Sequence, residues 1–462
     1  MKILLMLPYD KSYDWAVPDL GLGYIASCLR KERHDVTLNI MPRKFPSSSD
    51  LAAFIRKGSY DLIGIKVIFS AIAAVNETIR IVRGVKPDLP VILGGPQVSA
   101  DPQHIFDLIS GASYAFRGEA ETGIVEFMKC FVKNDLSDGS LSLVPNLVWR
   151  RSGAVTVNSA ALIEDLDTIL FPAWDLMEPK SFPCQPFSNL SRRYPIAPVL
   201  MTRGCPSRCS FCGANLINGH KIRKRSVENI MREIRLLTSQ FGVKEVQFFD
   251  SNCAHREGPL REVCSAIISE KIDITWSAPN GIRIDSIDKE LARLMKKSGC
   301  FQVSVGIESG SARILKQIRK GITLEMVKER VAVLRDAGIE VTGFFVIGFP
   351  GEKITEIEQT ISFAERLPLT SASFSILTPL PGTDIYQEVC EKLDREVSKN
   401  LSFMGYQNNL SEASPTKLAR LQKKAYMRFY MRPFIIKYFL KNLNSISKIN
   451  FLARRACSVL TR

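Results

Sequence analysis

The chain has few histidines and lacks the patterns of several common enzyme sites. Only four of its 462 residues are histidine, and there is no P-loop and no Ser-His-Asp array. No G-x-G-x-x-G follows the first expected strand, where the sequence reads LPYDKSYDW. These absences argue against a Walker-type phosphate loop, a serine hydrolase and the usual dinucleotide-binding fingerprint.

Long apolar runs are also absent. No stretch reaches the roughly 18 apolar residues that a membrane-spanning helix needs, and the longest ones, such as residues 67–75, are bounded by polar residues. The N-terminus shows no charged, apolar and small-residue leader, and the 11 cysteines are irregularly spaced. We therefore expect a cytoplasmic protein in a reducing compartment, without a membrane span.

Acidic residues are missing from one part of the chain. Residues 415–462 contain twelve Lys or Arg and no Asp or Glu, so this tail carries most of the net charge of +15. The rest of the chain is nearly balanced. Nucleic acid is therefore not an expected partner of the main body, because a phosphate-binding face would need clustered basic residues.

Strands and helices alternate through the first third of the sequence. The expected strands are short apolar runs at residues 2–8, 35–40, 61–69, 90–95 and 114–118, and a helical pattern follows each. This alternation predicts a doubly wound α/β domain, flavodoxin-like or Rossmann-like, over residues 1–140. A hairpin at 145–157 and a proline-rich linker are expected within residues 141–190.

A second alternation follows over residues 191–412. It has six expected strands, from APVLMTRG to SASFSILTP, with helical segments between them. Periodicity alone does not separate an open sheet from a barrel, but the cysteine loop after the first of these strands favours a partial (β/α)6 barrel. A basic helical region is expected over residues 413–462.

Three cysteines form a C-x3-C-x2-C loop after the first strand of this second alternation. Cys205, Cys209 and Cys212 are close enough in sequence for their thiolates to bind three irons of a [4Fe–4S] cluster and leave the fourth iron open. A zinc site would need a fourth ligand at finger-like spacing, and the nearest candidates are His220, Cys253 and His255. We therefore predict that the three cysteines are metal ligands and catalytic residues.

With this loop, the chain resembles the radical S-adenosylmethionine (SAM) superfamily, and within it the cobalamin-binding branch, over about residues 1–440. Further matching segments are VQFFDSN, NGIRIDSID, VSVGIESGS, GFFVIGFPGE and TPLPGTDIY. The resemblance implies that the cluster lies after the first barrel strand and that S-adenosylmethionine lies across the strand ends. The residues that it assigns to this cofactor and its surroundings are Phe211, Asp250, Arg283, Gly306 and Glu308.

The chemistry of two of these residues agrees with the resemblance. The guanidinium of Arg283 suits the carboxylate of S-adenosylmethionine, and Glu308 suits its amino or ribose groups. The alternatives are structural ion pairs at Arg283 and Glu308 and an ordinary packing aromatic at Phe211.

The resemblance also implies that the N-terminal domain binds cobalamin. The loop ILGGPQVSADP has Gly94, Gly95, Pro96 and Gln97 after the fourth strand, where missing side chains let the backbone approach a bulky cofactor. A Gly-Gly pair also serves as a plain strand-to-helix turn. The chain has no D-x-H-x-x-G, so we expect cobalamin without a protein histidine ligand and with Ser70 near the lower face of the corrin.

The function implied by this branch is radical methyl transfer. A 5′-deoxyadenosyl radical abstracts hydrogen from an unactivated carbon of a biosynthetic intermediate, such as a lipid or tetrapyrrole, and that carbon takes a methyl group from methylcobalamin. An anaerobic cyclase of the same family and a non-catalytic cobalamin or iron–sulfur sensor are the alternatives. A small-molecule substrate and a reductant such as flavodoxin or ferredoxin are the expected partners.

The basic tail has two interpretations. The segment KLARLQKKAYMRFYMRPFIIKYFLKNL mixes Arg and Lys with aromatic and aliphatic residues and could dock at an anionic membrane surface. We favour the alternative that Tyr426, Phe429 and Tyr430 pack against the barrel, because Pro433 interrupts the helix and aromatic stripes on helices are usually core. RNA binding is the weakest possibility.

Overall fold

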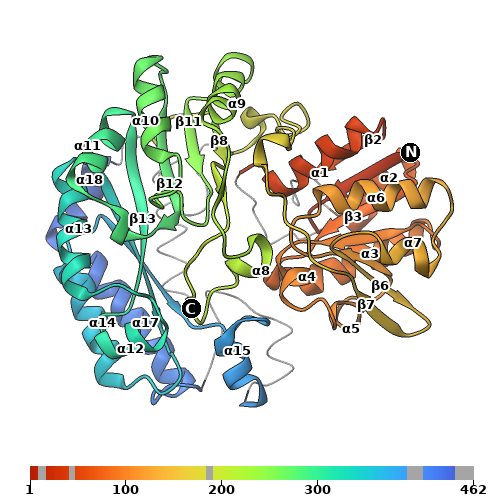
Figure 1. Ribbon diagram of the computed structural model, residues 1–462. Coiled ribbons are helices and arrows are strands. Elements are labelled where there is room, and N and C mark those ends of the chain that lie inside the picture. Colours follow the sequence, from red (N-terminus) through yellow and green to blue (C-terminus); the bar gives the residue numbers. More distant parts are fainter. Residues whose placement is uncertain (9–16, 41–46, 184–190, 393–408, 443–462) are drawn as a thin grey trace. The chain divides into compact units, whose positions relative to one another are not determined.

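A computed structural model describes residues 1–8, 17–40, 47–183, 191–392 and 409–442, with side chains to 438. Residues 443–462 of the basic tail lie outside the described part. The chain divides into two compact units, which Figure 1 shows. The first comprises Met1–Phe182 together with Gly213–Gly219, and the second comprises most of the remainder.

The first unit is built on a seven-stranded sheet with the order β2-β1-β3-β4-β5-β6-β7. Strands β1 to β5 are parallel, and their order is that of a flavodoxin-like doubly wound fold. The fold class expected for the N-terminal part is therefore confirmed. The strands are β1 (Lys2–Met6), β2 (Asp35–Asn39), β3 (Leu62–Lys66), β4 (Val91–Gly94), β5 (Tyr114–Phe116), β6 (Leu147–Arg151) and β7 (Ala154–Val157).

Both faces of this sheet are covered, and β1 shows why. Its four consecutive apolar residues, Ile3 to Met6, are all buried, as expected for a central parallel strand with helices on both sides. Helix α1 packs beside α6, and α2 packs beside α3. The helices of this unit are α1 (Leu20–Lys31), α2 (Ser48–Gly58), α3 (Ile72–Val85), α4 (Pro96–Ala100), α5 (Ile105–Leu108), α6 (Glu121–Val132), α7 (Asp138–Ser142) and α8 (Ala214–Asn218), with short 3-10 turns η2 (Phe69–Ala71), η3 (Leu166–Thr168) and η4 (Pro179–Ser181).

The expected hairpin forms, but it is not a separate element. Strand β6 pairs antiparallel with β5, and β7 pairs antiparallel with β6, so the hairpin extends the sheet. The expected domain end at residue 140 therefore falls inside the first unit. We propose that the N-terminal domain continues to Phe182, where this unit ends.

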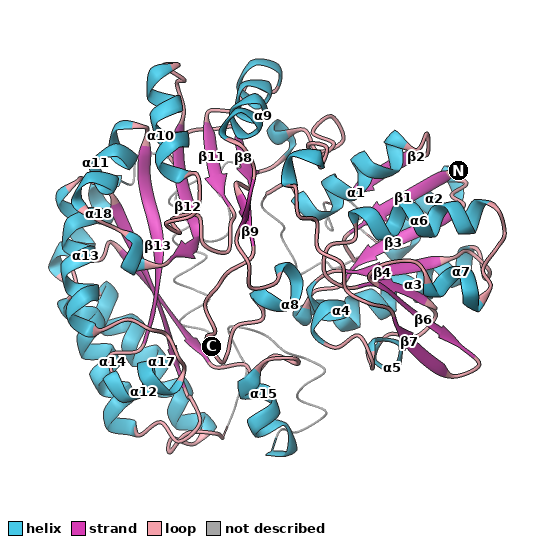
Figure 2. Cartoon of the chain, in the orientation of Figure 1, coloured by secondary structure: helices cyan, strands magenta, loops and turns pink. Residues whose placement is uncertain are grey.

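The second unit is built on a six-stranded parallel sheet in which neighbours in space follow one another along the chain, β8-β11-β12-β13-β14-β15. All six predicted strands are present, and the sheet curves with helices along its outer side, as in a partial barrel (Figure 2). The strands are β8 (Ile196–Val199), β11 (Glu245–Phe248), β12 (Thr275–Ile282), β13 (Cys300–Glu308), β14 (Glu340–Ile347) and β15 (Ser371–Ile376), and a small ribbon pairs β9 (Thr202–Arg203) with β10 (Arg223–Lys224).

Each strand of this sheet is followed by helical structure. The helices are α9 (Val227–Gln240), α10 (Leu260–Ser269), α11 (Lys289–Lys297), α12 (Ala312–Gln317), α13 (Leu324–Asp336), α14 (Ile354–Arg366), α15 (Asp384–Val389), α17 (Pro415–Tyr430) and α18 (Pro433–Asn442), with 3-10 turns η5 (Ile284–Ser286) and η6 (Cys390–Lys392). Because the strands are parallel, all their carboxyl ends meet at one edge, where this fold places its sites. Among the described residues, no helix is long and apolar enough to cross a membrane.

Helix α17 covers the edge strand β15. The Tyr430 hydroxyl donates to the Ala372 carbonyl at 2.8 Å, the Tyr426 hydroxyl accepts from the Phe374 amide at 3.1 Å, and Phe429 is fully buried. The prediction that these three aromatic residues pack against the barrel is confirmed. The helix ends at Tyr430 and α18 begins at Pro433, so the break expected at this proline is also present.

Two helical glycines should respond oppositely to Ala. At Gly123 a Cβ would overlap the Pro145 carbonyl oxygen and lie 2.9 Å from the Phe116 ring, whereas at Gly84 it would meet nothing within 4 Å. We expect Gly123→Ala to destabilise the fold by about 1–3 kcal/mol through overpacking. Gly84→Ala should be neutral or stabilise by up to about 1 kcal/mol, because Ala favours helix. Urea denaturation followed by circular dichroism measures both, and equal effects would contradict this packing.

Candidate active site

The cysteine loop connects β9 to α8 and is held by backbone hydrogen bonds from two directions. The Ser210 amide donates to the Ile318 carbonyl at 3.1 Å, and the Ile385 amide donates to the Ser210 carbonyl at 3.0 Å. These bonds fix the middle of the loop between the end of α12 and the start of α15. Within the loop the Cys212 amide donates to the Cys209 carbonyl at 3.2 Å.

The three cysteines of the loop differ in exposure. Cys205 and Cys209 are half-buried and Cys212 is exposed. Burial raises the pKa of the Cys209 thiol, and the nearby cations Lys320 and Arg283 act in the opposite direction. No three His, Cys, Asp or Glu side chains of the described residues converge on a single ion. Convergence is not needed for a cubane, because each thiolate binds a different iron.

Asp250 supports the start of the loop from the end of β11. Its carboxylate accepts hydrogen bonds from the Met201 amide at 3.1 Å, the Thr202 amide at 2.5 Å and the Thr202 hydroxyl at 2.7 Å. The side chain is buried, and burial raises its pKa to about 6. These contacts hold the backbone just before the cysteines, so Asp250 positions the start of the loop.

Arg283 joins the cysteine loop to two other segments. Its Nη1 donates to the Ser207 hydroxyl at 2.9 Å, between the first two cysteines, and to the Lys320 carbonyl at 3.1 Å. Its Nε and Nη2 donate to the Asp285 carboxylate at 3.2 and 2.9 Å. Each nitrogen of the guanidinium therefore already has a protein partner.

Glu308 and Lys320 form a buried ion pair beside this arginine. The Lys320 ammonium lies 2.8 Å from Glu308 Oε1, and only about a tenth of each side chain is exposed, 11% and 8%. A Cβ at Gly306 would lie 2.6 Å from Glu308 Oε1 and 2.7 Å from Lys320 Nζ, so a side chain here would displace the charged ends of this pair. Glu308 has a φ of 66°, a left-handed conformation that is rare outside glycine and is often found at functional sites.

Phe211 contacts the loop that follows β14. Its ring packs edge-on against Phe349, with the centroids 6.0 Å apart. The amides of Gly348 and Phe349 donate to Glu352 Oε2 at 2.6 and 3.1 Å, and Glu352 is fully buried. The aromatic beside the third cysteine is therefore held by a loop that is itself shaped by a buried carboxylate.

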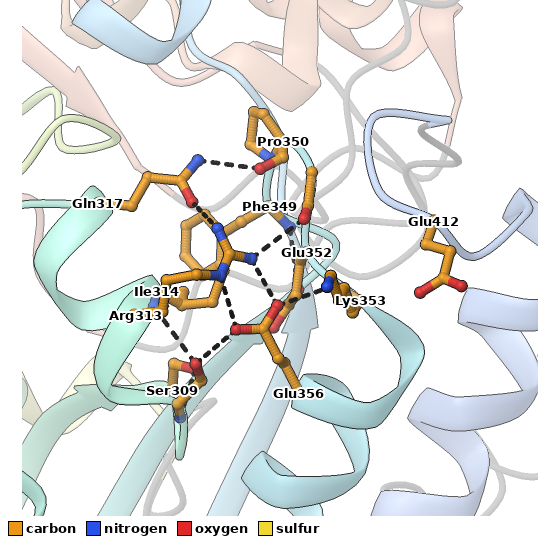
Figure 3. A network of polar contacts seen from close by, with 12 residues as sticks. Ser309, Arg313, Ile314, Gln317, Phe349, Pro350, Glu352, Lys353, Glu356 and Glu412 are labelled. Carbon is orange, nitrogen blue, oxygen red and sulfur yellow. Dashed lines mark hydrogen bonds and ion pairs between the residues drawn. The ribbon is translucent and has the colours of Figure 1, made fainter.

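Figure 3 shows the polar network around that loop. Arg313 binds both carboxylate oxygens of Glu356, at 2.8 and 2.5 Å, and donates to the Gly351 carbonyl at 3.0 Å. Gln317 donates to the Pro350 carbonyl at 2.9 Å. Helices α12 and α14 are thus connected through the loop that carries Phe349.

In the first unit, the predicted cobalamin loop meets the end of β3. Gly95 has a φ of 106°, and a Cβ there would lie 2.8 Å from the Val67 carbonyl oxygen. The Gln97 side chain is buried at 2% exposure, and its Oε1 accepts no hydrogen bond from the described residues. Gly94 ends β4, Pro96 starts α4, and Ser70 is exposed in η2. A close backbone approach and a buried polar atom without a partner fit a loop built to receive a large polar cofactor.

Several residues at these two places were not predicted from the sequence. Lys320, Ser207 and Asp285 carry the contacts of Glu308 and Arg283, and Lys66 at the end of β3 pairs with the buried Asp19 at 2.5 Å. A lysine beside an arginine in IRKGIT has the pattern of a solvated helix end. Only the fold turns it inward.

Comparisons with known proteins agree with both units. Residues 199–364 match the radical SAM superfamily, and residues 12–128 match the B12 binding domain. The chain is 31% identical to an uncharacterized methyltransferase of Pyrococcus horikoshii, over 100% of this chain and 98% of that protein. It is 28% identical to the cytidylyl-2-hydroxyethylphosphonate methyltransferase of Streptomyces wedmorensis, over 88% and 85% of the two chains. The solved structure of the cobalamin-dependent S-adenosylmethionine radical enzyme OxsB shares the fold, with a TM-score of 0.74, 17% identity, and coverage of 99% of this chain and 71% of that one.

Two glutamates of the network in Figure 3 should change stability oppositely with pH. Burial raises the pKa of Glu352 from 4.5 to about 7, so the ionised side chain destabilises the fold. The stability that the protonated side chain contributes is therefore lost as the pH rises from about 4.5 through about 7. Gln resembles the neutral acid. Glu352→Gln should therefore match the parent near pH 5 and exceed its stability near pH 8, by up to about 3 kcal/mol.

Glu356→Gln is the matched control. The hydrogen bond to Arg313 is the main cause that lowers the pKa of Glu356 to about 2, so its ionised form stabilises the fold above its ordinary pKa of 4.5. This variant should lose stability at neutral pH, and its deficit should shrink as the pH falls towards about 2. Thermal denaturation across this pH range measures both, and parallel curves for Glu352→Gln and the parent would refute the assignment.

Proposed function

Because the chain belongs to the cobalamin-binding radical S-adenosylmethionine enzymes, we propose that it is a methyltransferase that moves a methyl group from methylcobalamin to an unactivated carbon of a biosynthetic intermediate. A [4Fe–4S] cluster, S-adenosylmethionine and cobalamin are its cofactors. The observation that carries the proposal is that this chain has both cofactor-binding units and that two relatives, matched over most of their length, are methyltransferases.

When bound, the cluster supplies the electron that cleaves S-adenosylmethionine to a 5′-deoxyadenosyl radical, and cobalamin supplies the methyl group. The residues described above fit these groups. Three cysteine side chains at C-x3-C-x2-C spacing in one loop are the donors that an iron–sulfur cluster requires, so we propose Cys205, Cys209 and Cys212 as its ligands. A reductant such as flavodoxin or ferredoxin would deliver the electron.

We propose different roles for the two cations beside the cysteine loop. Arg283 is a positioning residue, because its donors already hold Asp285, Ser207 and the Lys320 carbonyl. Among the described residues, the Lys320 ammonium donates to Glu308, although an ammonium has three donor hydrogens. Lys320 is therefore better suited than Arg283 to the carboxylate of S-adenosylmethionine, and Glu308 is suited to its amino or ribose groups.

The remaining predicted residues shape the two sites. Asp250 positions the start of the cysteine loop, Phe211 provides an aromatic face beside the third cysteine, and Gly306 leaves space for the Glu308–Lys320 pair. In the first unit, Gly94, Gly95 and Pro96 form the turn, and Gln97 and Ser70 offer polar atoms to cobalamin. No histidine takes part.

Comparing metabolites of a deletion strain tests the function without knowledge of the substrate. The strain should accumulate a compound that lacks one methyl group of the parent's product, and the wild-type gene should restore the product while Cys205→Ala should not. Labelled methionine should place its label in the restored methyl group. A product that differs by a closed ring would instead establish the cyclase. Absence of 5′-deoxyadenosine above the Cys205→Ala background would establish the non-catalytic sensor.

Variants of the two cations test their proposed roles. Arg283→Lys and Ser207→Ala should lower the iron and sulfide bound after anaerobic reconstitution, because the loop loses an anchor. Lys320→Met should keep the cluster but weaken S-adenosylmethionine binding by about 10- to 100-fold, the loss expected for a hydrogen bond to a charged group. Lys320→Arg is a control that retains the positive charge. In Lys320→Met the buried Glu308 carboxylate loses its partner, and the double variant Lys320→Met/Glu308→Gln removes that unpaired charge and so shows how much of the effect it causes. If Arg283→Lys instead keeps its full iron content but binds S-adenosylmethionine more weakly, Arg283 and not Lys320 would be the residue that binds the carboxylate of S-adenosylmethionine.

A further inference from the structure

The C-terminal helices combine a packed face with an exposed apolar face. Met427, Met431, Phe434 and Ile436 are 46%, 66%, 55% and 46% exposed. They are four of the ten large apolar side chains that the described residues leave exposed, and they fall within a stretch of ten residues. Such a concentration is unusual on a surface where single exposed apolar residues are the rule. We call these four residues the apolar face.

The packing of α17 prevents this face from turning inward. On the opposite side of the helix, Leu418, Ala425 and Phe429 are fully buried. The Gln422 amide donates to the Phe374 carbonyl at 2.8 Å, and Tyr430 bonds to Ala372 of the same strand. Rotation of the helix would break these bonds to the edge of the sheet, so Met427 and Met431 must point outward.

Helix α18 is held in the same way. Ile435 is fully buried, and the Tyr438 hydroxyl donates to Glu340 Oε2 at 2.7 Å. Before it, Arg432 donates to the carbonyls of Leu367 at 3.1 Å and Leu369 at 3.3 Å. Phe434 and Ile436, on either side of Ile435 in the sequence, remain exposed.

Exposed basic residues accompany the apolar face on its two helices. Lys417, Arg420, Lys423 and Lys437 are exposed on the same two helices. Lys424 and Arg428 are exposed too, and Glu358 and Glu365 of α14 pair with them. The part of these helices whose side chains are described, residues 415–438, contains no Asp or Glu.

We propose that this face docks the enzyme on an anionic phospholipid surface. Exposed apolar side chains among Lys and Arg, without acidic residues on their own segment, match the interfacial region of a bilayer in both polarity and charge. RNA would pair with the basic residues but would offer no apolar surface to Met431 and Phe434. A second copy of the chain would place two positively charged surfaces against each other. Docking would suit a lipid or tetrapyrrole substrate, but it does not depend on the proposed methyl transfer.

Co-sedimentation of the reconstituted full-length enzyme with vesicles tests the proposal. Vesicles of phosphatidylcholine with phosphatidylglycerol should bind the enzyme, salt should weaken the binding, and pure phosphatidylcholine should bind at least about tenfold less, since each basic residue near an anionic surface contributes about 1 kcal/mol. Met431→Ser/Phe434→Ser should reduce partitioning by about tenfold or more. Arg420→Glu/Lys437→Glu should reduce it and remove most of its salt dependence.

A matched control distinguishes binding through the apolar face from nonspecific binding of any exposed apolar residue to vesicles. Val132→Ser/Leu143→Ser removes two other exposed apolar side chains, 58% and 83% exposed in the first unit, and should leave binding unchanged. None of these variants should change 5′-deoxyadenosine formation in detergent-free buffer. The proposal is overturned if Met431→Ser/Phe434→Ser binds vesicles like the parent. Two other results for Met431→Ser/Phe434→Ser would also overturn it. One is a loss of RNA binding with unchanged vesicle binding, and the other is conversion of a dimer to a monomer in sedimentation velocity with unchanged vesicle binding.

Discussion

The second unit's site depends on how a loop without regular secondary structure is held in one shape. The residues between β9 and α8 have no regular ladder of backbone hydrogen bonds, so neighbouring strand and helix ends supply partners in addition to the bond from the Cys212 amide to the Cys209 carbonyl. Asp250 takes the amides before the first cysteine, Arg283 binds the Ser207 hydroxyl, and Ile318 and Ile385 bond the backbone at Ser210. Four segments far apart in sequence thus fix three thiols, and the parallel sheet makes this possible by bringing its strand ends to one edge.

The charged side chains buried at this edge are also held by contacts with neighbouring segments. An isolated ion in such a place would cost several kcal/mol, so each buried charge has a partner or a set of backbone donors. Lys320 neutralises Glu308, and the guanidinium of Arg283 is neutralised by Asp285. Glu352 forms no ion pair with the described residues, and the two amides that it binds do not offset its burial, which raises its pKa. A substrate or cofactor that brings charge to this edge therefore meets groups whose positions are already set.

The sequence was sufficient for the features that are encoded locally. Strand alternation, the cysteine spacing and the break at Pro433 each depend on a few adjacent residues, and the fold that they indicate is the one observed. Features that depend on distant residues were missed. The pairing of β6 with β5 is not visible in the hairpin's own sequence, and nothing in IRKGIT shows that Lys320 turns toward Glu308, twelve residues earlier. The residue types of a site can thus be found by spacing, whereas the division of roles between Arg283 and Lys320 needs their contacts.

The orientation of helix α17 determines two surfaces of the protein at once. The edge of β15 exposes backbone groups that would otherwise invite pairing with another strand, and Tyr426, Tyr430 and Gln422 satisfy them. Using one face of α17 for this purpose fixes which residues occupy the opposite face, because side chains three and four positions apart share a side. The aromatic residues that favoured packing therefore also determine that Met427 and Met431 lie outside. Covering the sheet edge and presenting an apolar surface are consequences of the same helix orientation, and neither could be changed without the other.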